Sequence, residues 1–187
     1  SMRYPADTQA KLRFSVHCAS ALAYLLHRQR DAVGLCIFSD KIDELTPVKS
    51  TVTHLNKVFR ILENVLSSDA TPGKNTRVAD VLHEIAEKTH KRSLVILFSD
   101  MFDGAGESQE EIFKSLQHLK HNKHEVLLFH VSDHETELAF NFEDRPHEFV
   151  DLENGQKVTL NPLSIKDSYI KALAEFHMNL KMRCNQL

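Results

Sequence analysis

The sequence has few glycines and lacks the glycine-rich motifs that bind nucleotide phosphates. Five of its 187 residues are glycine, against a usual share of about 7%. Neither G-x-G-x-x-G nor G-x-x-x-x-G-K-[ST] occurs in it, and these are the motifs whose backbone amides cradle phosphate groups. We therefore do not expect a nucleotide held by a glycine-rich loop.

Long hydrophobic runs, a strong charge imbalance and paired cysteines are also missing. Apolar runs such as Leu94 to Phe98 fall far short of the roughly 18 residues that span a bilayer, and no signal-peptide pattern opens the chain. A net charge of −3 does not attract nucleic acid. Cys18, Cys36 and Cys184 are odd in number and widely spaced, which favours free thiols in a reducing compartment. We expect a cytoplasmic chain with no membrane span and no nucleic-acid partner.

Helical and strand patterns alternate along the first two thirds of the chain. Apolar residues recur every three or four positions in four segments, which predicts amphipathic helices over 8–29, 55–66, from about 76, and from about 108. Continuous apolar runs at 32–38 and 94–98, and the mostly apolar segment 126–131, are typical of strands covered on both faces. The polar segment 41–48 suits an edge strand that hairpins back. This order predicts an α/β fold with a doubly wound, mostly parallel sheet and helices on both faces.

The last third of the chain predicts a small hairpin followed by a helix. Residues 149–152 and 158–160 alternate around Asn154-Gly155, which favours a type I′ turn. Asn161 and Pro162 occupy the cap and first position of a helix with apolar residues at helical spacing up to Leu180. We interpret residues 1–187 as one domain with a hairpin insertion at about 147–160.

Serine and aspartate follow each of the three buried strands, as Ser39-Asp40, Ser99-Asp100 and Ser132-Asp133. Parallel strands end on one edge of a sheet, and ligands bind outside those carboxyl ends. Carboxylate and hydroxyl oxygens are ligands that Mg²⁺ prefers. Thr76, at the head of a helix, and Asp103, just past Asp100, are further oxygen donors for this edge. The alternative is that these residues only cap helices and form turns.

Several stretches resemble a bacterial family of von Willebrand factor A-like (VWA-like) domains, often encoded beside MoxR-type AAA ATPases. The similarity covers nearly the whole chain. It is carried by five stretches, residues 1–5 with Lys11-Leu12, 29–35 (QRDAVGL), 97–100 (LFSD), 124–130 (HEVLLFH) and 149–155 (FVDLENG). The resemblance implies a non-catalytic protein-interaction module, with a MoxR-type ATPase as a candidate partner. The hairpin at 147–160 and the acidic stretch before it either contact such a partner or only cover the end of the sheet, and the sequence does not decide between these.

The resemblance also implies a metal-ion-dependent adhesion site for Mg²⁺ or another divalent cation. Ser1, Thr76 and Asp100 match its ligands, with Ser99, Asp103 and Asp40 as supporting residues around them. The Asp and first Ser of the family's D-x-S-x-S motif are absent, as are the first central strand that carries them and a last strand of the VWA-like sheet. We therefore expect a domain truncated at both ends that binds Mg²⁺ weakly or not at all.

Two other interpretations stay open at this stage. Asp40, Asp100 and Asp103 are also the residue types of a metal-dependent hydrolase, although no Asp-x-Asp motif follows any predicted strand. His118, His121 and His124 are spaced by three residues beside two lysines. They suit either a zinc site or a solvated helix end.

Overall fold

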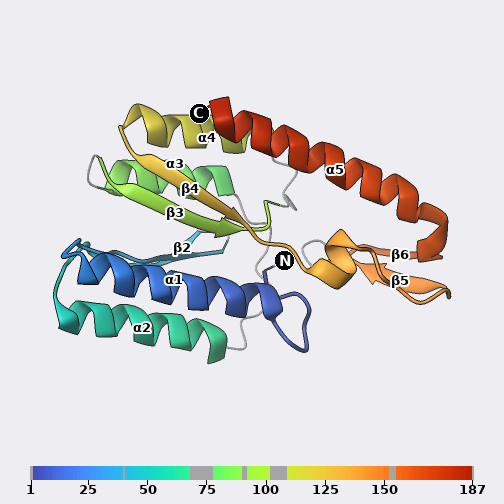
Figure 1. Ribbon diagram of the computed structural model, residues 1–187, viewed down its shortest axis with the longest axis horizontal. Coiled ribbons are helices and arrows are strands. Elements are labelled where there is room, and N and C mark those ends of the chain that lie inside the picture. Colours follow the sequence, from blue (N-terminus) through green and yellow to red (C-terminus); the bar gives the residue numbers. More distant parts are fainter. Residues whose placement is uncertain are drawn as a thin grey trace.

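The computed structural model describes residues 2–39, 41–67, 78–89, 92–101, 109–151 and 155–186. Helices and strands are interspersed along these residues (Figure 1). The helices are α1 (Ala10–Arg28), α2 (Val52–Ser67), α3 (Val78–Lys88), α4 (Gln109–His121), the π-helix η1 (His134–Leu138) and α5 (Pro162–Gln186). The strands are β1 (Cys36–Phe38), β2 (Ile42–Leu45), β3 (Leu94–Ser99), β4 (Glu125–His130), β5 (His147–Val150) and β6 (Lys157–Leu160). The predicted mixed α/β architecture is confirmed.

The described strands pair two by two rather than in one continuous sheet. β3 and β4 are parallel and in register from Leu94 opposite Glu125 to Ser99 opposite His130. β1 and β2 form an antiparallel hairpin, as do β5 and β6. Among the described residues β1 has no ladder to β3. One parallel pair with a helical crossover is therefore established, whereas a doubly wound sheet is not confirmed.

Two apolar clusters lie on opposite sides of the β1–β2 hairpin. One joins α3 and α4 to β3 and the last turns of α5, with Leu82, Leu116 and Leu119 almost fully buried. The other joins α1 and α2. Alternate residues of the β1 segment serve both clusters, because Cys36 packs into the first and Ile37 into the second. A strand covered on both faces explains the continuous apolar run at 32–38.

The predicted helix starts and hairpins agree with the structure wherever residues are described. The 41–48 segment does hairpin back onto β1 through β2. The amide of Leu163 donates to the Asn161 side chain at 3.1 Å, which gives α5 its expected cap. The starts predicted near Thr76 and Ser108, and the turn residues 152–154, lie outside the described residues. No described helix is both long and apolar enough to cross a membrane.

Candidate functional site

The carboxyl ends of β3 and β4 form one edge of the parallel pair, which we call the rim. Ser99 is the last residue of β3 and lies opposite His130, the last residue of β4. Asp100 and Asp133 follow these strands, so two of the three predicted Ser-Asp dipeptides are brought to the same edge. Ser39 is the residue directly after β1, and Asp40 lies outside the described residues.

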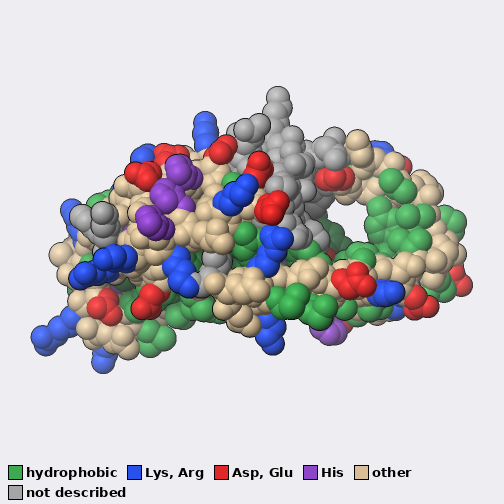
Figure 2. All heavy atoms as spheres, turned by 90° about the horizontal axis from the view of Figure 1, so that it is seen from above, with side chains coloured by type: hydrophobic (Ala, Val, Ile, Leu, Met, Phe, Trp, Pro, Cys, Tyr) green, Lys and Arg blue, Asp and Glu red, His purple; other side chains and the backbone are tan. Residues whose placement is uncertain are grey.

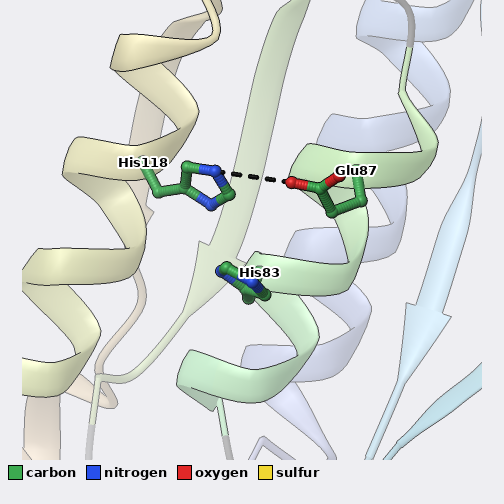
Figure 3. Close-up of side chains that lie close together, drawn as sticks. All are labelled: His83, Glu87 and His118. Carbon is green, nitrogen blue, oxygen red and sulfur yellow. Dashed lines mark ion pairs between the residues drawn. The ribbon is translucent and has the colours of Figure 1, made fainter.

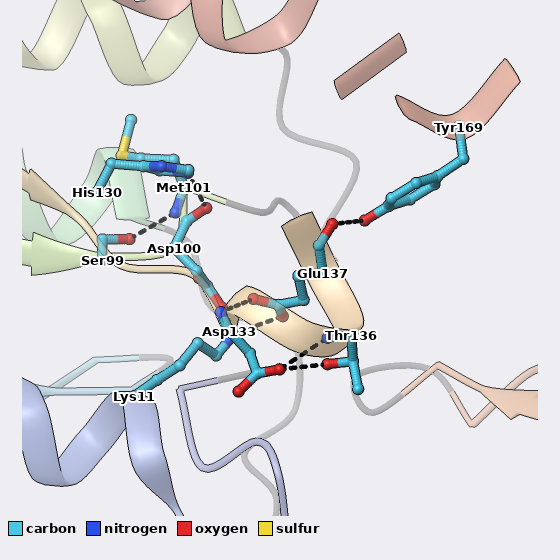
Figure 4. Close-up of polar contacts among 9 residues, drawn as sticks. All are labelled: Lys11, Ser99, Asp100, Met101, His130, Asp133, Thr136, Glu137 and Tyr169. Carbon is cyan, nitrogen blue, oxygen red and sulfur yellow. Dashed lines mark hydrogen bonds and ion pairs between the residues drawn. The ribbon is translucent and has the colours of Figure 1, made fainter. Parts of the chain in front are cut away.

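A buried ammonium group, that of Lys11 on α1, is the centre of the rim (Figure 4). Lys11 Nζ lies 3.1 Å from Asp100 Oδ2 and 2.7 Å from Glu137 Oε1. The Lys11 and Asp100 side chains are 1% and 4% exposed, and that of Glu137 is 17% exposed. The Tyr4 ring lies 5.7 Å from the same ammonium group. The Lys11–Asp100–Glu137 triad thus ties α1, the end of β3 and η1 together.

Burial makes this triad energetically demanding. A buried charge is tolerated only when it is paired and hydrogen-bonded, because desolvation penalises each ion alone. Lys11 balances one carboxylate and leaves the triad with one excess negative charge. The second oxygen of Glu137 accepts the backbone N–H of Asp133 at 2.7 Å, which disperses that charge. The charges of the triad are therefore compensated by ion pairs within it and by a hydrogen bond from the adjacent backbone.

The π-helix η1 continues the rim beyond β4. Asp133 caps it by accepting the Thr136 N–H at 2.9 Å and the Thr136 hydroxyl at 2.7 Å. The hydroxyl bond is the main reason why the pKa of Asp133 is lowered. The Tyr169 hydroxyl of α5 donates to the Glu137 carbonyl at 2.9 Å. Five-residue π segments are rare and occur often at functional sites.

His130 supports the rim from the inner side. Its Nε2 lies 3.0 Å from the backbone carbonyl of Asp100, so the proton sits on Nε2 and donates to that oxygen. Burial, and then the nearby His177, lower the pKa of His130. The His177 ring meets it edge-on, with centroids 4.9 Å apart. A neutral His130 therefore fixes the backbone of Asp100.

The sequence-predicted metal ligands gather only in part. Ser1, Thr76, Asp40 and Asp103 lie outside the described residues. The Ser99 hydroxyl oxygen accepts the Met101 N–H at 3.0 Å, within a turn where Met101 has a positive φ of 53°. The Asp100 carboxylate is bound by Lys11. The described residues do not fit a divalent cation on Asp100, because the Lys11 ammonium already balances this carboxylate.

Lys11 is the functional residue that sequence reasoning missed. It was expected only as part of an amphipathic helix, yet it is 2% exposed. Lys11 and Ser15 lie one turn apart beside the apolar stripe of Leu12 and Val16, and this spacing alone does not show that they are buried. Both are buried, and the Ser15 hydroxyl donates to the Lys11 carbonyl at 2.8 Å. A lysine is almost never fully buried unless it is paired, so the burial of Lys11 depends on its two carboxylate partners.

The histidine run at the end of α4 does not form one cluster. His121 is exposed, whereas His124 is 4% exposed and its Nδ1 accepts the Ser93 N–H at 3.3 Å. His118 lies instead against α3, where Glu87 Oε1 is 3.5 Å from its Nε2. The zinc site considered for His118, His121 and His124 is therefore wrong for His121 and His124, because their side chains do not gather with His118.

Comparison with known proteins identifies the family. The family model described as protein of unknown function DUF58 matches residues 1–177. The chain belongs to the DUF58 family. A search of curated proteins and a search of solved structures each found no match for this DUF58 chain.

Proposed function

We propose that this DUF58 chain is a non-catalytic protein-interaction domain of the VWA-like type that binds its partner at the rim. The observation that carries the proposal is the Lys11–Asp100–Glu137 triad, which fixes α1, β3 and η1 at the carboxyl ends of two parallel strands. Ligands of open α/β sheets bind outside those ends. A rim held by buried ion pairs presents a preorganised surface, which lowers the entropic cost of binding.

The accessible part of the rim is acidic. His134 and Glu135, at the start of η1, have side chains 79% and 67% exposed. Asp133 and Glu137 lie on either side of them in the sequence, and each is partly exposed. The exposed Glu135 and the excess negative charge of the triad favour a partner that presents basic side chains here. A MoxR-type ATPase is the partner class to which the sequence resemblance points.

A more specific proposal is that this contact depends on a metal ion. In it, Ser1, Thr76 and Asp100 hold a divalent cation that carries an acidic side chain of the partner. That arrangement requires Lys11 to leave Asp100, since the ammonium group lies 3.1 Å from Oδ2. The rim as described supports metal-independent binding instead.

The hydrolase alternative has less support. It needs Asp100, with Asp40 and Asp103, to hold a catalytic metal open to substrate and water. Asp100 is 3% exposed and paired with Lys11. Turnover of phosphoester or peptide substrates by the purified chain, lost on Asp100→Ala, would favour the hydrolase over the interaction domain.

A charge-reversal experiment tests the proposed contact. A MoxR-type ATPase from the same genome is titrated against the immobilised chain, with Mg²⁺ and with EDTA. We expect Glu135→Lys to weaken binding, because it reverses an exposed charge on the rim. Glu125→Lys is the matched control, since Glu125 is also exposed but begins β4 at the opposite end. Equal binding by wild type and both variants contradicts the rim as the contact surface.

The same titration separates the other contact modes. Loss of binding in EDTA for the wild type supports the metal-dependent form. Binding that is lost only when residues 147–160 are deleted supports the β5–β6 hairpin. Binding that survives both treatments, and also Glu135→Lys, overturns all the proposed contacts.

A further inference from the structure

A second group of ionisable side chains lies between α3 and α4. His83 and Glu87 are one helical turn apart on α3, and His118 faces them from α4 (Figure 3). One ligand atom from each residue lies within 4.8 Å of the other two. The His83 and His118 rings are stacked with centroids 4.5 Å apart. Three metal-ligating groups thus converge from two helices.

The backbones that carry these side chains are held rigidly by the core. Leu82, Ala86 and Leu119 are sequence neighbours of the three residues and are 0%, 3% and 0% exposed in the cluster between α3 and α4. The Asn122 side chain donates to the Ala86 carbonyl at 3.3 Å and adds a polar tie between the same two segments. The spacing of the group is therefore set by packing and not by the side chains themselves.

The side chains are open to solvent although their backbones are fixed. Glu87 is 64% exposed and His118 is 27% exposed at the side chain. Histidine side chains gather on the face seen in Figure 2, on the side where Figure 1 places α4. An ion can therefore enter without unfolding of either helix.

The donor set and its dimensions suit zinc. Two imidazoles and one carboxylate, with water as the fourth ligand, form an established zinc coordination set. Zinc bonds of about 2.0 to 2.1 Å in a tetrahedron place neighbouring ligand atoms about 3.3 Å apart. Glu87 Oε1 and His118 Nε2 are 3.5 Å apart. We propose that His83, Glu87 and His118 bind one Zn²⁺ ion that bridges α3 and α4.

Small side-chain rotations complete the site. The χ2 angle of histidine is broad, so the two stacked rings turn a nitrogen each toward a shared ion with little strain. His118 binds through Nε2, which faces Glu87, because its Nδ1 is buried and has no hydrogen-bond partner among the described residues. Imidazole nitrogen favours Zn²⁺ over Mg²⁺. This site is therefore chemically distinct from the oxygen-rich rim.

Calorimetric titration of zinc into the untagged chain tests the site. We expect one equivalent to bind in the wild type. Glu87→Gln and His118→Ala should each weaken that binding by about tenfold or more. His121→Ala is the matched control, since His121 is exposed on the same helix and outside the group. The chain has 12 histidines in all, so this control is required.

Thermal unfolding gives a second readout that does not depend on heats of binding. Zinc should raise the unfolding temperature of the wild type and of His121→Ala, because a ligand that binds only the folded state stabilises it. It should not raise that of Glu87→Gln, an exposed and nearly isosteric change that keeps the fold. Equal zinc affinity in wild type, Glu87→Gln and His118→Ala overturns the site, as does loss of binding in His121→Ala.

Discussion

Lys11 is the residue on which the rim depends most. It is almost fully buried between Asp100 and Glu137, so removal of its charge leaves two carboxylates without a cation. Breaking a buried ion pair from one side typically costs about 3 to 5 kcal/mol. We expect Lys11→Met, which keeps the length of the side chain, to lower the free energy of unfolding by an amount in that range, as measured in urea.

A double variant separates charge from packing. Lys11→Met with Asp100→Asn also removes one of the two unpaired carboxylate charges, so it should recover part of the loss. If the double variant is as unstable as the sum of the two single variants, the ion pair contributes nothing.

Cys36 is a second residue with an environment that controls its chemistry. Burial, and then the charges of Glu84 and Asp43, raise the pKa of the Cys36 thiol from 9.0 to about 11. The thiolate is the reactive form, and its lower abundance outweighs its greater nucleophilicity. We expect iodoacetamide to modify Cys36 at least about tenfold more slowly in the folded chain than in urea.

Peptide mass spectrometry of the wild-type chain follows Cys36 separately from Cys18 and Cys184. The rate at Cys36 in the folded chain should still rise between about pH 9 and pH 10, because the thiol is not yet ionised there. A rate at Cys36 that is equal in the folded and unfolded chains contradicts the raised pKa.

At the scale of elements, η1 depends on its cap. Asp133 accepts both the amide and the hydroxyl of Thr136. Loss of a capping acceptor costs about 1 kcal/mol, so Asp133→Ala should lower the free energy of unfolding by about that much. Asp133→Asn keeps an acceptor oxygen and should lower it less. Equal loss in both variants, measured in urea, argues against capping as the cause.

The stability of the folded chain should also depend on pH through His130, the last residue of β4. Its pKa in the folded chain is lowered below the ordinary 6.5, so the unfolded chain binds more protons between the two values. Stability is therefore complete above about pH 6.5 and is lost as the pH falls through the folded pKa. We expect the unfolding temperature to fall from about pH 7.5 to about pH 5.

A pair of variants tests whether His130 causes the fall in unfolding temperature. His130→Gln keeps an N–H donor for the Asp100 carbonyl but does not titrate, so its unfolding temperature should fall less on acidification. His17→Gln replaces an exposed histidine on α1 and should behave as the wild type. The same acid-induced fall in His130→Gln and wild type would show that other groups cause it. The lowered pKa of Asp133 acts in the same direction at lower pH.

At the scale of the whole molecule, the sequence predicted helices and strands better than contacts between distant residues. Apolar spacing located α1, α2, β3 and β4, because each of these packs apolar residues into a core cluster. The β5–β6 hairpin was located by its alternating residues and its Asn154-Gly155 dipeptide. Parallel pairing of β3 and β4 brought Ser99-Asp100 and Ser132-Asp133 to one edge, as expected. These predictions rest on local periodicity and on the direction of strands.

Contacts between distant residues could not be predicted from local periodicity. Lys11 and Asp100 are 89 positions apart, and Lys11 and Glu137 are 126 apart, so periodicity gives no hint of their pairing. The spacing of His118, His121 and His124 within α4 says nothing of His83 and Glu87 on α3, with which His118 groups. The rim was predicted as a place for a cation, and the cation found there is a lysine.

Calorimetric titration of Mg²⁺ into the wild-type chain shows which cation balances the Asp100 carboxylate at the rim. With the Lys11 ammonium in that role, and not a divalent cation, we expect weak Mg²⁺ binding or none, with no stoichiometric heat at micromolar Mg²⁺. Stoichiometric binding of Mg²⁺ with micromolar affinity, abolished by Asp100→Asn, would contradict that role of Lys11.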